Sequence, residues 1–191
     1  MKNVSIIIPA RFKSTRFPGK PLTKISGIEM IIRVCNICEK VIKKKNIYVA
    51  TDDNRIARVV EKFGYNCILT KINCLTGTDR VFQASKKIKS KIIINVQGDE
   101  PVINPNDIKK IIKAKINFPR HVICGFNEIP YSGSENINIP KVVFNSNYDM
   151  VYMSRALIPK NKNLKIKNKI FKQVCIYGFN IKQLRKFNSL K

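Results

Sequence analysis

The stretch IIIPARFKSTRFPGKPL, at residues 6–22, decides the fold of this 191-residue chain. It begins inside VSIIIP, residues 4–9, a run of mostly β-branched residues that predicts a short strand with no polar face. Such a strand is typical of a parallel sheet covered by helices on both sides. After Pro9 the loop carries four cations: Arg11, Lys13, Arg16 and Lys20. Like charges this close repel one another unless water screens them or an anion binds, so the loop is a candidate anion site.

The same alternation of short apolar strands and amphipathic helices continues to about residue 120. Further strands are predicted at 46–51, 66–70 and 91–97, and helices at 30–43, 52–64, 79–88 and 103–116. This pattern indicates the α/β class, with a doubly wound, mostly parallel sheet between two helical layers. Beyond residue 120 we expect little helix and four more strands, some of them antiparallel, at 121–126, 141–145, 148–154 and 172–179.

Composition excludes several classes of protein. Hydrophobic residues make up 44% of the chain, so it is not a disordered tail, and no apolar stretch is long enough to span a bilayer. The first apolar run ends too early, at Pro9, for a signal peptide, and we therefore expect a cytoplasmic protein without membrane insertion. Among six cysteines only Cys35 and Cys38 form a C-x-x-C pair, and His121 is the single histidine, so no zinc set is complete. Reduced, half-buried thiols are expected, with a redox pair as the alternative.

The formal net charge of +25 comes from 37 Lys and Arg against 12 Asp and Glu. Such a balance is typical of nucleic-acid binding proteins. The lysines are scattered through the whole chain, however, and there is no tryptophan and no interleaving of aromatic and basic residues. We expect no specific nucleic-acid partner, and non-specific RNA binding stays open as an alternative.

Three loops leave the predicted sheet at the carboxyl ends of its strands, where ligands bind in such folds. They are residues 10–23, 76–80 and 97–101, and we expect them to converge. In the first, Gly19 and Lys20 suit a close approach to phosphate, although neither G-x-x-x-x-G-K-[ST] nor G-x-G-x-x-G occurs. In the third, Asp99 and Glu100 follow the most hydrophobic strand and suit Mg²⁺ shared with phosphates. Together the loops favour metal-assisted chemistry on a nucleoside triphosphate, whereas a solvated turn and helix-start acids are the plainer alternatives.

Six motifs in one order carry a family resemblance: IIPARFKSTRFPGKPL, YVATDD, TGTDR, NVQGDEP, SRALIP and IYGF. With them the chain, from residue 4 to about 187, resembles the 3-deoxy-manno-octulosonate cytidylyltransferase (CMP-Kdo synthetase) family. The resemblance implies a nucleotide-diphospho-sugar transferase-like fold, in a single nucleotidyltransferase domain over residues 1–191. It also implies transfer of CMP from CTP to the acidic eight-carbon sugar Kdo, with Mg²⁺, for lipopolysaccharide biosynthesis. A homodimer formed through the region of residues 150–180 is expected on the same ground.

The resemblance further implies a role for individual residues. Lys20 and Asp99 would be catalytic, with Asp99 as the Mg²⁺ ligand and Lys20 neutralising charge at the attacked phosphorus. The nucleotide would be bound by Arg11, Ser14, Lys20, Thr76, Thr78, Arg80 and Gln97. The sugar would be bound by Lys141, Arg155 and Gln173.

Two departures from the family pattern leave alternatives open. Gln173 stands where the family usually has histidine, so the substrate could be a related acidic sugar such as 8-amino-Kdo or a sialic-acid-like sugar. A nucleotidyltransferase that acts on a hexose phosphate is a separate alternative. The family also runs further and carries a second Mg²⁺-binding aspartate near its C-terminus, whereas no acid follows Asp149 here and Glu100 is the nearest substitute. We therefore expect the chain to lack the C-terminal part usual in the family. An impaired, non-catalytic basic domain that binds nucleotide or RNA is the remaining alternative.

Overall fold

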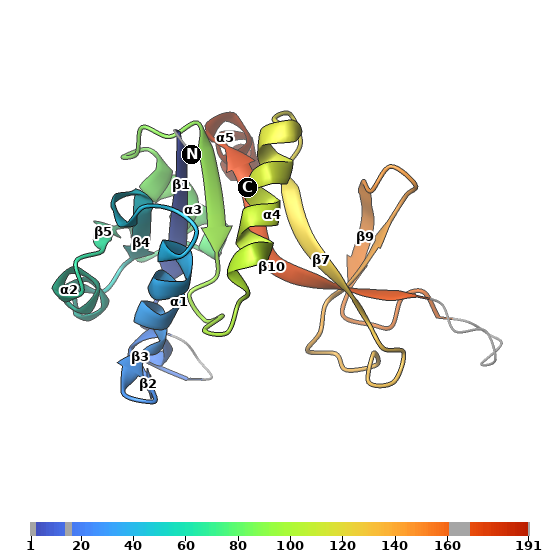
Figure 1. Ribbon diagram of the computed structural model, residues 1–191, viewed down its shortest axis with the longest axis horizontal. Coiled ribbons are helices and arrows are strands. Elements are labelled where there is room, and N and C mark those ends of the chain that lie inside the picture. Colours follow the sequence, from blue (N-terminus) through green and yellow to red (C-terminus); the bar gives the residue numbers. More distant parts are fainter. Residues whose placement is uncertain (1–2, 14–16, 161–168, 191) are drawn as a thin grey trace. The chain divides into compact units, whose positions relative to one another are not determined.

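The computed structural model describes residues 3–13, 17–160 and 169–190, and the chain forms two compact units (Figure 1). Unit 1 runs to Ile123 and resumes at Ile176, and unit 2 comprises Cys124–Cys175. Within the described residues, none of the helices is both long enough and apolar enough to cross a membrane.

Unit 1 is built on a mostly parallel sheet. Its strands are β1 (Val4–Ala10), β4 (Ile47–Thr51), β5 (Asn66–Leu69), β6 (Ile92–Val96) and the last part of β10 (Ile170–Asn180). Their order is β5-β4-β1-β6-β10, and only β10 runs antiparallel to its neighbour, with Ile176 opposite Val96. All seven residues of β1 are buried, because helices cover both faces of the sheet. The predicted α/β class and strand positions are confirmed.

The first four helices of unit 1 follow the predicted apolar periodicity, and the fifth was not predicted. They are α1 (Met30–Glu39), α2 (Asn54–Lys62), α3 (Gly77–Ser85), α4 (Pro105–Asn117) and α5 (Ile181–Ser189). Helices α1 and α4 contact each other on one face of the sheet, and α3 and α5 contact each other on the opposite face (Figure 1). Short elements between β1 and α1 complete the unit: the 3-10 turn η1 (Lys20–Leu22) and the hairpin β2 (Lys24–Ile25) and β3 (Ile28–Glu29). A second 3-10 turn, η2 (Lys44–Asn46), precedes β4.

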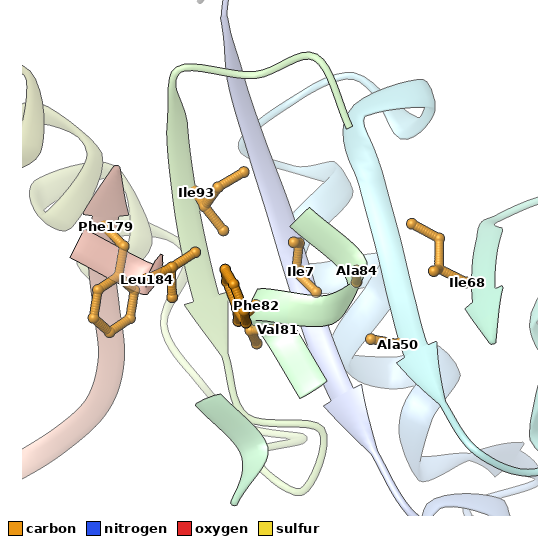
Figure 2. Close-up of a cluster of buried hydrophobic side chains, with 9 residues drawn as sticks. All are labelled: Ile7, Ala50, Ile68, Val81, Phe82, Ala84, Ile93, Phe179 and Leu184. Carbon is orange, nitrogen blue, oxygen red and sulfur yellow. The ribbon is translucent and has the colours of Figure 1, made fainter. Parts of the chain in front are cut away.

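Helix α5 corrects the expectation of little helix beyond residue 120. It begins with a capping box in which the Asn180 side chain accepts from the Gln183 amide and the Gln183 side chain accepts from the Asn180 amide. One of its side chains, Leu184, is fully buried in a cluster with Phe82 of α3 and Phe179 of β10 (Figure 2). The same cluster includes Ile7 and Ile93 of the central strands. The helix therefore closes one face of the sheet through a single apolar anchor.

A buried lysine fixes the start of α5. The side chain of Lys115, in the last turn of α4, is fully buried, although lysine is usually a surface residue. Its Nζ donates to the carbonyl oxygens of Pro119 and His121, at 3.0 and 2.5 Å, and to Oε1 of Gln183 at 2.8 Å. Burial lowers the pKa of Lys115 to about 8. The three acceptors satisfy the three donors of the ammonium group and join α4 to the capping residue of α5.

Unit 2 is built of strands, among which β8 pairs antiparallel with both β9 and β10. It contains most of β7 (Ile123–Ile129), β8 (Lys141–Phe144), β9 (Met150–Ser154) and the first part of β10. Strand β8 lies between β9 and β10, and β7 pairs with β10. Phe126, Phe144, Tyr148 and Phe171 form an aromatic cluster with ring centroids 4.6–6.3 Å apart. All four strands predicted beyond residue 120 are confirmed.

The single anchor of α5 gives a stability prediction. Leu184→Ala removes buried methyl groups from the cluster of Figure 2 and should lower the free energy of unfolding by about 2–4 kcal/mol in urea denaturation. Leu190→Ala is the control, because Leu190 follows the same helix and is 77% exposed. Equal stability of the two variants would show that α5 is not anchored through Leu184.

Candidate active site

The three predicted loops do converge, around a cavity of about 470 Å³ beyond the carboxyl ends of β1 and β6 in unit 1. The side chains that these loops contribute to its lining include Arg11, Phe17, Lys20, Thr76, Arg80, Gln97 and Asp99. The volume lies within the range of pockets that bind small molecules. Parallel pairing causes the convergence, since β5, β4, β1 and β6 are paired in parallel and end at the same edge. Strands β1 and β6 lead into the first and third loops, and β5 precedes the second.

An ion pair joins the first and third loops across this cavity. Lys20 Nζ donates to Asp99 Oδ2 at 2.7 Å, although the two residues are 79 positions apart in the sequence. The side chains of Lys20 and Asp99 remain 37% and 53% exposed. Both charges are therefore accessible to a ligand that enters the cavity.

Glycines make this meeting of loops possible. A Cβ on Gly98 would lie 2.8 Å from the carbonyl oxygen of Pro9, which is backbone and cannot move aside. Gly98 thus lets the residues after β6 pass directly over the end of β1. Gly19, just before Lys20, has φ +72°, and its backbone amide donates to the Phe12 carbonyl at 2.9 Å. This bond lies within the first loop, residues 10–23, which we call the cationic loop.

The structure places most of the predicted nucleotide-binding residues in or beside this cavity. Arg11, Lys20, Thr76, Arg80 and Gln97 line it. Thr78 lies in the first turn of α3 and is not part of the lining. Ser14, like Arg16, lies outside the described residues. Their contacts with nucleotide stay predictions.

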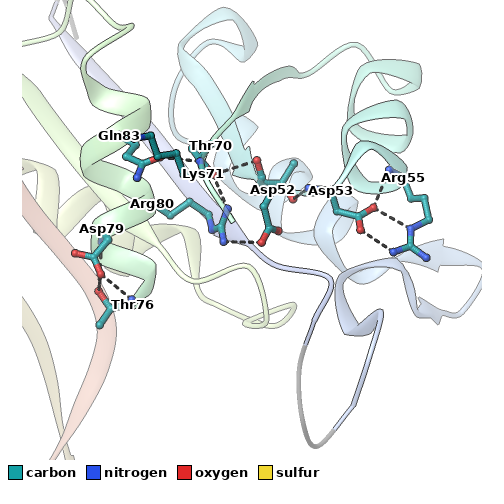
Figure 3. A network of polar contacts seen from close by, with 10 residues as sticks. Asp52, Asp53, Arg55, Thr70, Lys71, Thr76, Asp79, Arg80 and Gln83 are labelled. Atoms are coloured by element: carbon teal, nitrogen blue, oxygen red, sulfur yellow. Dashed lines mark hydrogen bonds and ion pairs between the residues drawn. The ribbon is translucent and has the colours of Figure 1, made fainter. Parts of the chain in front are cut away.

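Thr76 starts helix α3 at the edge of the cavity. Its Oγ1 accepts from the Asp79 amide at 3.3 Å, and Asp79 Oδ2 accepts from the Thr76 amide at 2.7 Å, which completes a capping box (Figure 3). The positive end of the α3 dipole therefore faces the cavity, and this favours a negative ligand.

Arg80 is more deeply buried than the expected role in nucleotide binding suggests. Its guanidinium donates to Asp52 Oδ2 at 3.0 Å and to Thr70 Oγ1, and the two charged side chains are only 4% and 9% exposed (Figure 3). Arg80 lines the cavity, and Asp52 and Thr70 hold its charged group. Asp52 is a structural partner that the sequence did not identify, although it lies in the quoted motif YVATDD. Its distance of 28 residues from Arg80 leaves no local signal.

The three predicted sugar-binding residues gather around one segment of unit 2, residues 136–140. Lys141 is fully buried, and its Nζ donates to the carbonyl oxygens of Asn136, Ile139 and Arg155 at 2.7–2.9 Å. Arg155 Nη1 donates to the Ile137 carbonyl at 3.1 Å, and the backbone amide of Gln173 donates to the Pro140 carbonyl at 2.9 Å, while its side-chain amide donates to Cys124 Sγ at 3.6 Å. Since the ammonium of Lys141 has three donors and all are engaged, bonding a sugar requires it to release one. The sugar-binding roles stay predictions.

Asp99 is the carboxylate that a metal would meet in the cavity. Within the described ranges no three His, Cys, Asp or Glu residues form a group that could hold a metal ion. One exposed carboxylate fits Mg²⁺ that is bound mainly by substrate phosphates, because this ion commonly takes only one or two protein carboxylates and keeps its waters. The donor set therefore fits a metal that arrives with a triphosphate better than a permanently bound one.

None of the six cysteines forms a disulfide. Cys35 and Cys38 are fully buried in α1, and burial raises the pKa of Cys38 to about 12. A raised pKa suppresses the thiolate that redox chemistry requires. The cysteines of α1 therefore behave as small apolar residues.

A mostly parallel α/β sheet with a cationic cavity at its carboxyl edge defines a nucleotide-binding protein of the doubly wound class. Residues 5–191 match the family model described as Cytidylyltransferase. The chain belongs to the cytidylyltransferase family.

Similar proteins support this assignment over nearly the whole chain. The 3-deoxy-manno-octulosonate cytidylyltransferase of Bacteroides thetaiotaomicron is 35% identical over 96% of this chain and 77% of its own length. The 8-amino-3,8-dideoxy-manno-octulosonate cytidylyltransferase of Shewanella oneidensis is 37% identical over 98% of this chain and 79% of its own length.

Solved structures agree with this assignment. CMP:2-keto-3-deoxy-manno-octonic acid synthetase complexed with CTP is similar with a TM-score of 0.92 and 34% identity, covering 100% of this chain and 79% of that one. A cytidylyltransferase from Leptospira borgpetersenii has a TM-score of 0.64 at 18% identity, covering 99% of this chain and 65% of that one, and shares the fold.

The buried pair of Arg80 and Asp52 gives a second prediction. Asp52→Ala leaves the Arg80 charge buried without its carboxylate and should lower the free energy of unfolding by about 3–5 kcal/mol in urea denaturation. Lys110→Ala, which breaks an exposed pair with Asp107, should change it by less than about 1 kcal/mol. A loss for Asp52→Ala as small as that of the control would contradict a structural role for this pair.

Proposed function

We propose that this protein transfers CMP from CTP to the anomeric hydroxyl of Kdo and releases pyrophosphate, as a step of lipopolysaccharide biosynthesis. The observation that carries the proposal is the accessible pair of Lys20 and Asp99 in the cavity, within a fold that is similar at a TM-score of 0.92 to a synthetase complexed with CTP. The names of the similar proteins supply the substrate class.

The charges of the cavity suit this reaction. A sugar acid that attacks a triphosphate brings two anions together, so the enzyme must offset their repulsion. Arg11 and Lys20 line the cavity, and the start of α3 adds a positive dipole. Nucleotidyl transfer depends mainly on positioning and charge neutralisation. Lys20 would neutralise the charge that develops at the α-phosphorus, and we assign no general base.

We propose Mg²⁺ as the cofactor, with Asp99 as the protein ligand. When bound, the ion would neutralise phosphate charge and polarise the attacked phosphorus. In the pair of Lys20 and Asp99, an ammonium group that can bind phosphate lies 2.7 Å from a carboxylate oxygen that can bind the metal. CTP is the nucleotide, and we place the reaction in the cytoplasm, where CTP is available and the six thiols remain reduced.

The activity test is a pyrophosphate-release assay with CTP, Mg²⁺ and Kdo. Lys20→Ala should lower kcat/KM by at least about a hundredfold, because it removes a cation needed most in the transition state. Asp99→Asn should have a similar effect and should raise the Mg²⁺ concentration required, and EDTA should stop the wild-type reaction. Lys24→Ala is the control, since Lys24 is an exposed cation of the hairpin outside the cavity lining.

Parallel reactions with 8-amino-Kdo, a sialic acid and a hexose 1-phosphate define the substrate. A preference for Kdo supports the proposal, and a preference for 8-amino-Kdo moves the enzyme to the second named group of relatives. Release of pyrophosphate only with hexose 1-phosphate, or RNA binding that depends on Lys20 without detectable CTP binding, would overturn it.

We further propose that the protein is a homodimer formed through β9. This strand lies at one end of the strand order of unit 2, and Met150, Val151, Tyr152 and Met153 are 40–66% exposed. Consecutive exposed apolar residues on an edge strand call for a covering partner. A second copy of the chain would pair the free edge and bury these side chains.

The dimer is tested by light scattering after size-exclusion chromatography. The wild type should run as a dimer, and Tyr152→Glu should shift it to a monomer by placing a charge in the interface. Ile116→Glu, at a 51% exposed site of α4, should leave the dimer intact. A monomeric wild type, or a dimer that persists in Tyr152→Glu, contradicts this interface.

A further inference from the structure

The second acid of the motif YVATDD has no part in the cavity lining but makes a closely fitted ion pair. Asp53 follows β4 and caps α2, and its Oδ1 accepts from the Arg55 amide at 2.9 Å. The Arg55 guanidinium donates through Nε to Oδ1 at 2.9 Å and through Nη2 to Oδ2 at 2.7 Å (Figure 3). This two-pronged pairing fixes the plane of the guanidinium. The bonds from Arg55 also hold the pKa of Asp53 below its usual value, so the carboxylate stays charged at neutral pH.

The guanidinium that Asp53 orients lies on the ring of Phe12. Its Cζ is 3.3 Å from the ring centroid, the stacking distance of a cation–π contact. The Arg55 side chain is 59% exposed, so burial does not hold it in place. Asp53 therefore provides the orientation and Phe12 the surface.

Phe12 belongs to the cationic loop and supports the residue before Lys20. Its carbonyl accepts the Gly19 amide at 2.9 Å, and a Cβ on Gly19 would lie only 3.1 Å from the ring. The ring of Phe12 therefore packs directly against Gly19 while Arg55 lies on it. Helix α2 also contacts η1, the turn that begins with Lys20.

We propose that Arg55, oriented by Asp53, is a positioning residue that clamps Phe12 and so holds the cationic loop with Lys20 directed into the cavity. The inference deepens the proposed function and rests on it. Another cation beside a loop that already carries Arg11, Lys13, Arg16 and Lys20 would normally add to the repulsion. The carboxylate of Asp53 neutralises Arg55, so the guanidinium can pack on the loop without that repulsion.

Arginine is required for this contact. A lysine at position 55 keeps the charge but lacks the planar group that pairs with a carboxylate and stacks on a ring at once. Arg55→Lys should therefore behave like Arg55→Ala. Phe12→Tyr keeps the ring and should behave like the wild type, whereas Phe12→Leu should not.

The first test measures CTP binding by calorimetry in the presence of Mg²⁺. Arg55→Ala should weaken CTP binding about two- to fivefold, in the range of a cation–π contact, with no comparable change in Tm. The matched control is Arg58→Ala, an exposed arginine one turn further along the same helix. In a double-mutant cycle, the loss caused by Arg55→Ala together with Phe12→Leu should be smaller than the sum of the two single losses, because both changes break the contact between Arg55 and Phe12. Equal affinities of the two arginine variants, or additive effects in the cycle, would overturn the proposal.

The second test needs no nucleotide and separates this proposal from the proposed function. Amide hydrogen exchange of the free protein should be faster at Gly19 and Leu22 in Arg55→Ala than in Arg58→Ala, since their hydrogen bonds to Phe12 and Gly19 close the loop. Faster exchange in a protein that binds no CTP would reject the function and keep the clamp. Unchanged exchange with normal CTP binding would keep the function and reject the clamp.

Discussion

Parallel hydrogen bonding of β1 between β4 and β6 is the constraint on which the site depends. It places the carboxyl ends of three strands side by side, with Ala10 opposite Thr51 and Ile7 opposite Asn95. The cationic loop, the acids after β4 and the acid after β6 are thereby brought to one edge, although they lie far apart in the sequence. Gly98 allows the last of these segments to pass within contact distance of Pro9. The cavity is a consequence of strand order, and it is lined by residues that follow β1 and β6 and by residues at the start of α3.

The acids at this edge explain how the chain tolerates so many cations there. Asp52, Asp53 and Asp99 each pair with one cation, namely Arg80, Arg55 and Lys20. The pairs differ in burial, and the difference decides what each can do. The pair of Asp52 and Arg80 is almost fully buried and fixes β4 to α3, whereas the pair of Asp53 and Arg55 lies at the surface and acts on the neighbouring loop. Within the cationic loop itself, Asp99 offsets the charge of Lys20 before any ligand binds, whereas Asp52 and Asp53 offset the charges of Arg80 and Arg55 on the helices beside it.

The sequence predicted the layers and the position of the site because both follow from local patterns. Apolar runs gave the strands, helical periodicity gave α1 to α4, and the rule that ligands bind beyond strand ends gave the convergence of the loops. Helix α5 was not predicted because eight of its nine residues are not buried, so it shows little apolar periodicity. The cap formed by Asn180 and Gln183 is the sequence feature that marks its start. The burial of Lys115 and Lys141 was not predicted for another reason. Each ammonium is satisfied by two carbonyl oxygens from nearby positions and by a third oxygen from further along the chain, Oε1 of Gln183 for Lys115 and the Arg155 carbonyl for Lys141. Sequence spacing does not encode the convergence of these acceptors on one buried group. The pairing of Asp52 with Arg80 was missed in the same way.

The exposure of Lys20 and Asp99 is what makes their pair suitable for chemistry. An exposed ion pair contributes only about 0–1 kcal/mol, because water screens both charges. Lys20 can therefore exchange the carboxylate for a phosphate oxygen at little cost, and Asp99 is then free to bind a cation. A buried pair such as that of Arg80 and Asp52 cannot make this exchange, since separating it leaves a charge without a partner away from water. The same edge of the sheet thus holds one ion pair that keeps the fold rigid and another that a substrate can open. Their difference in solvent access, rather than their chemical identity, assigns the two roles.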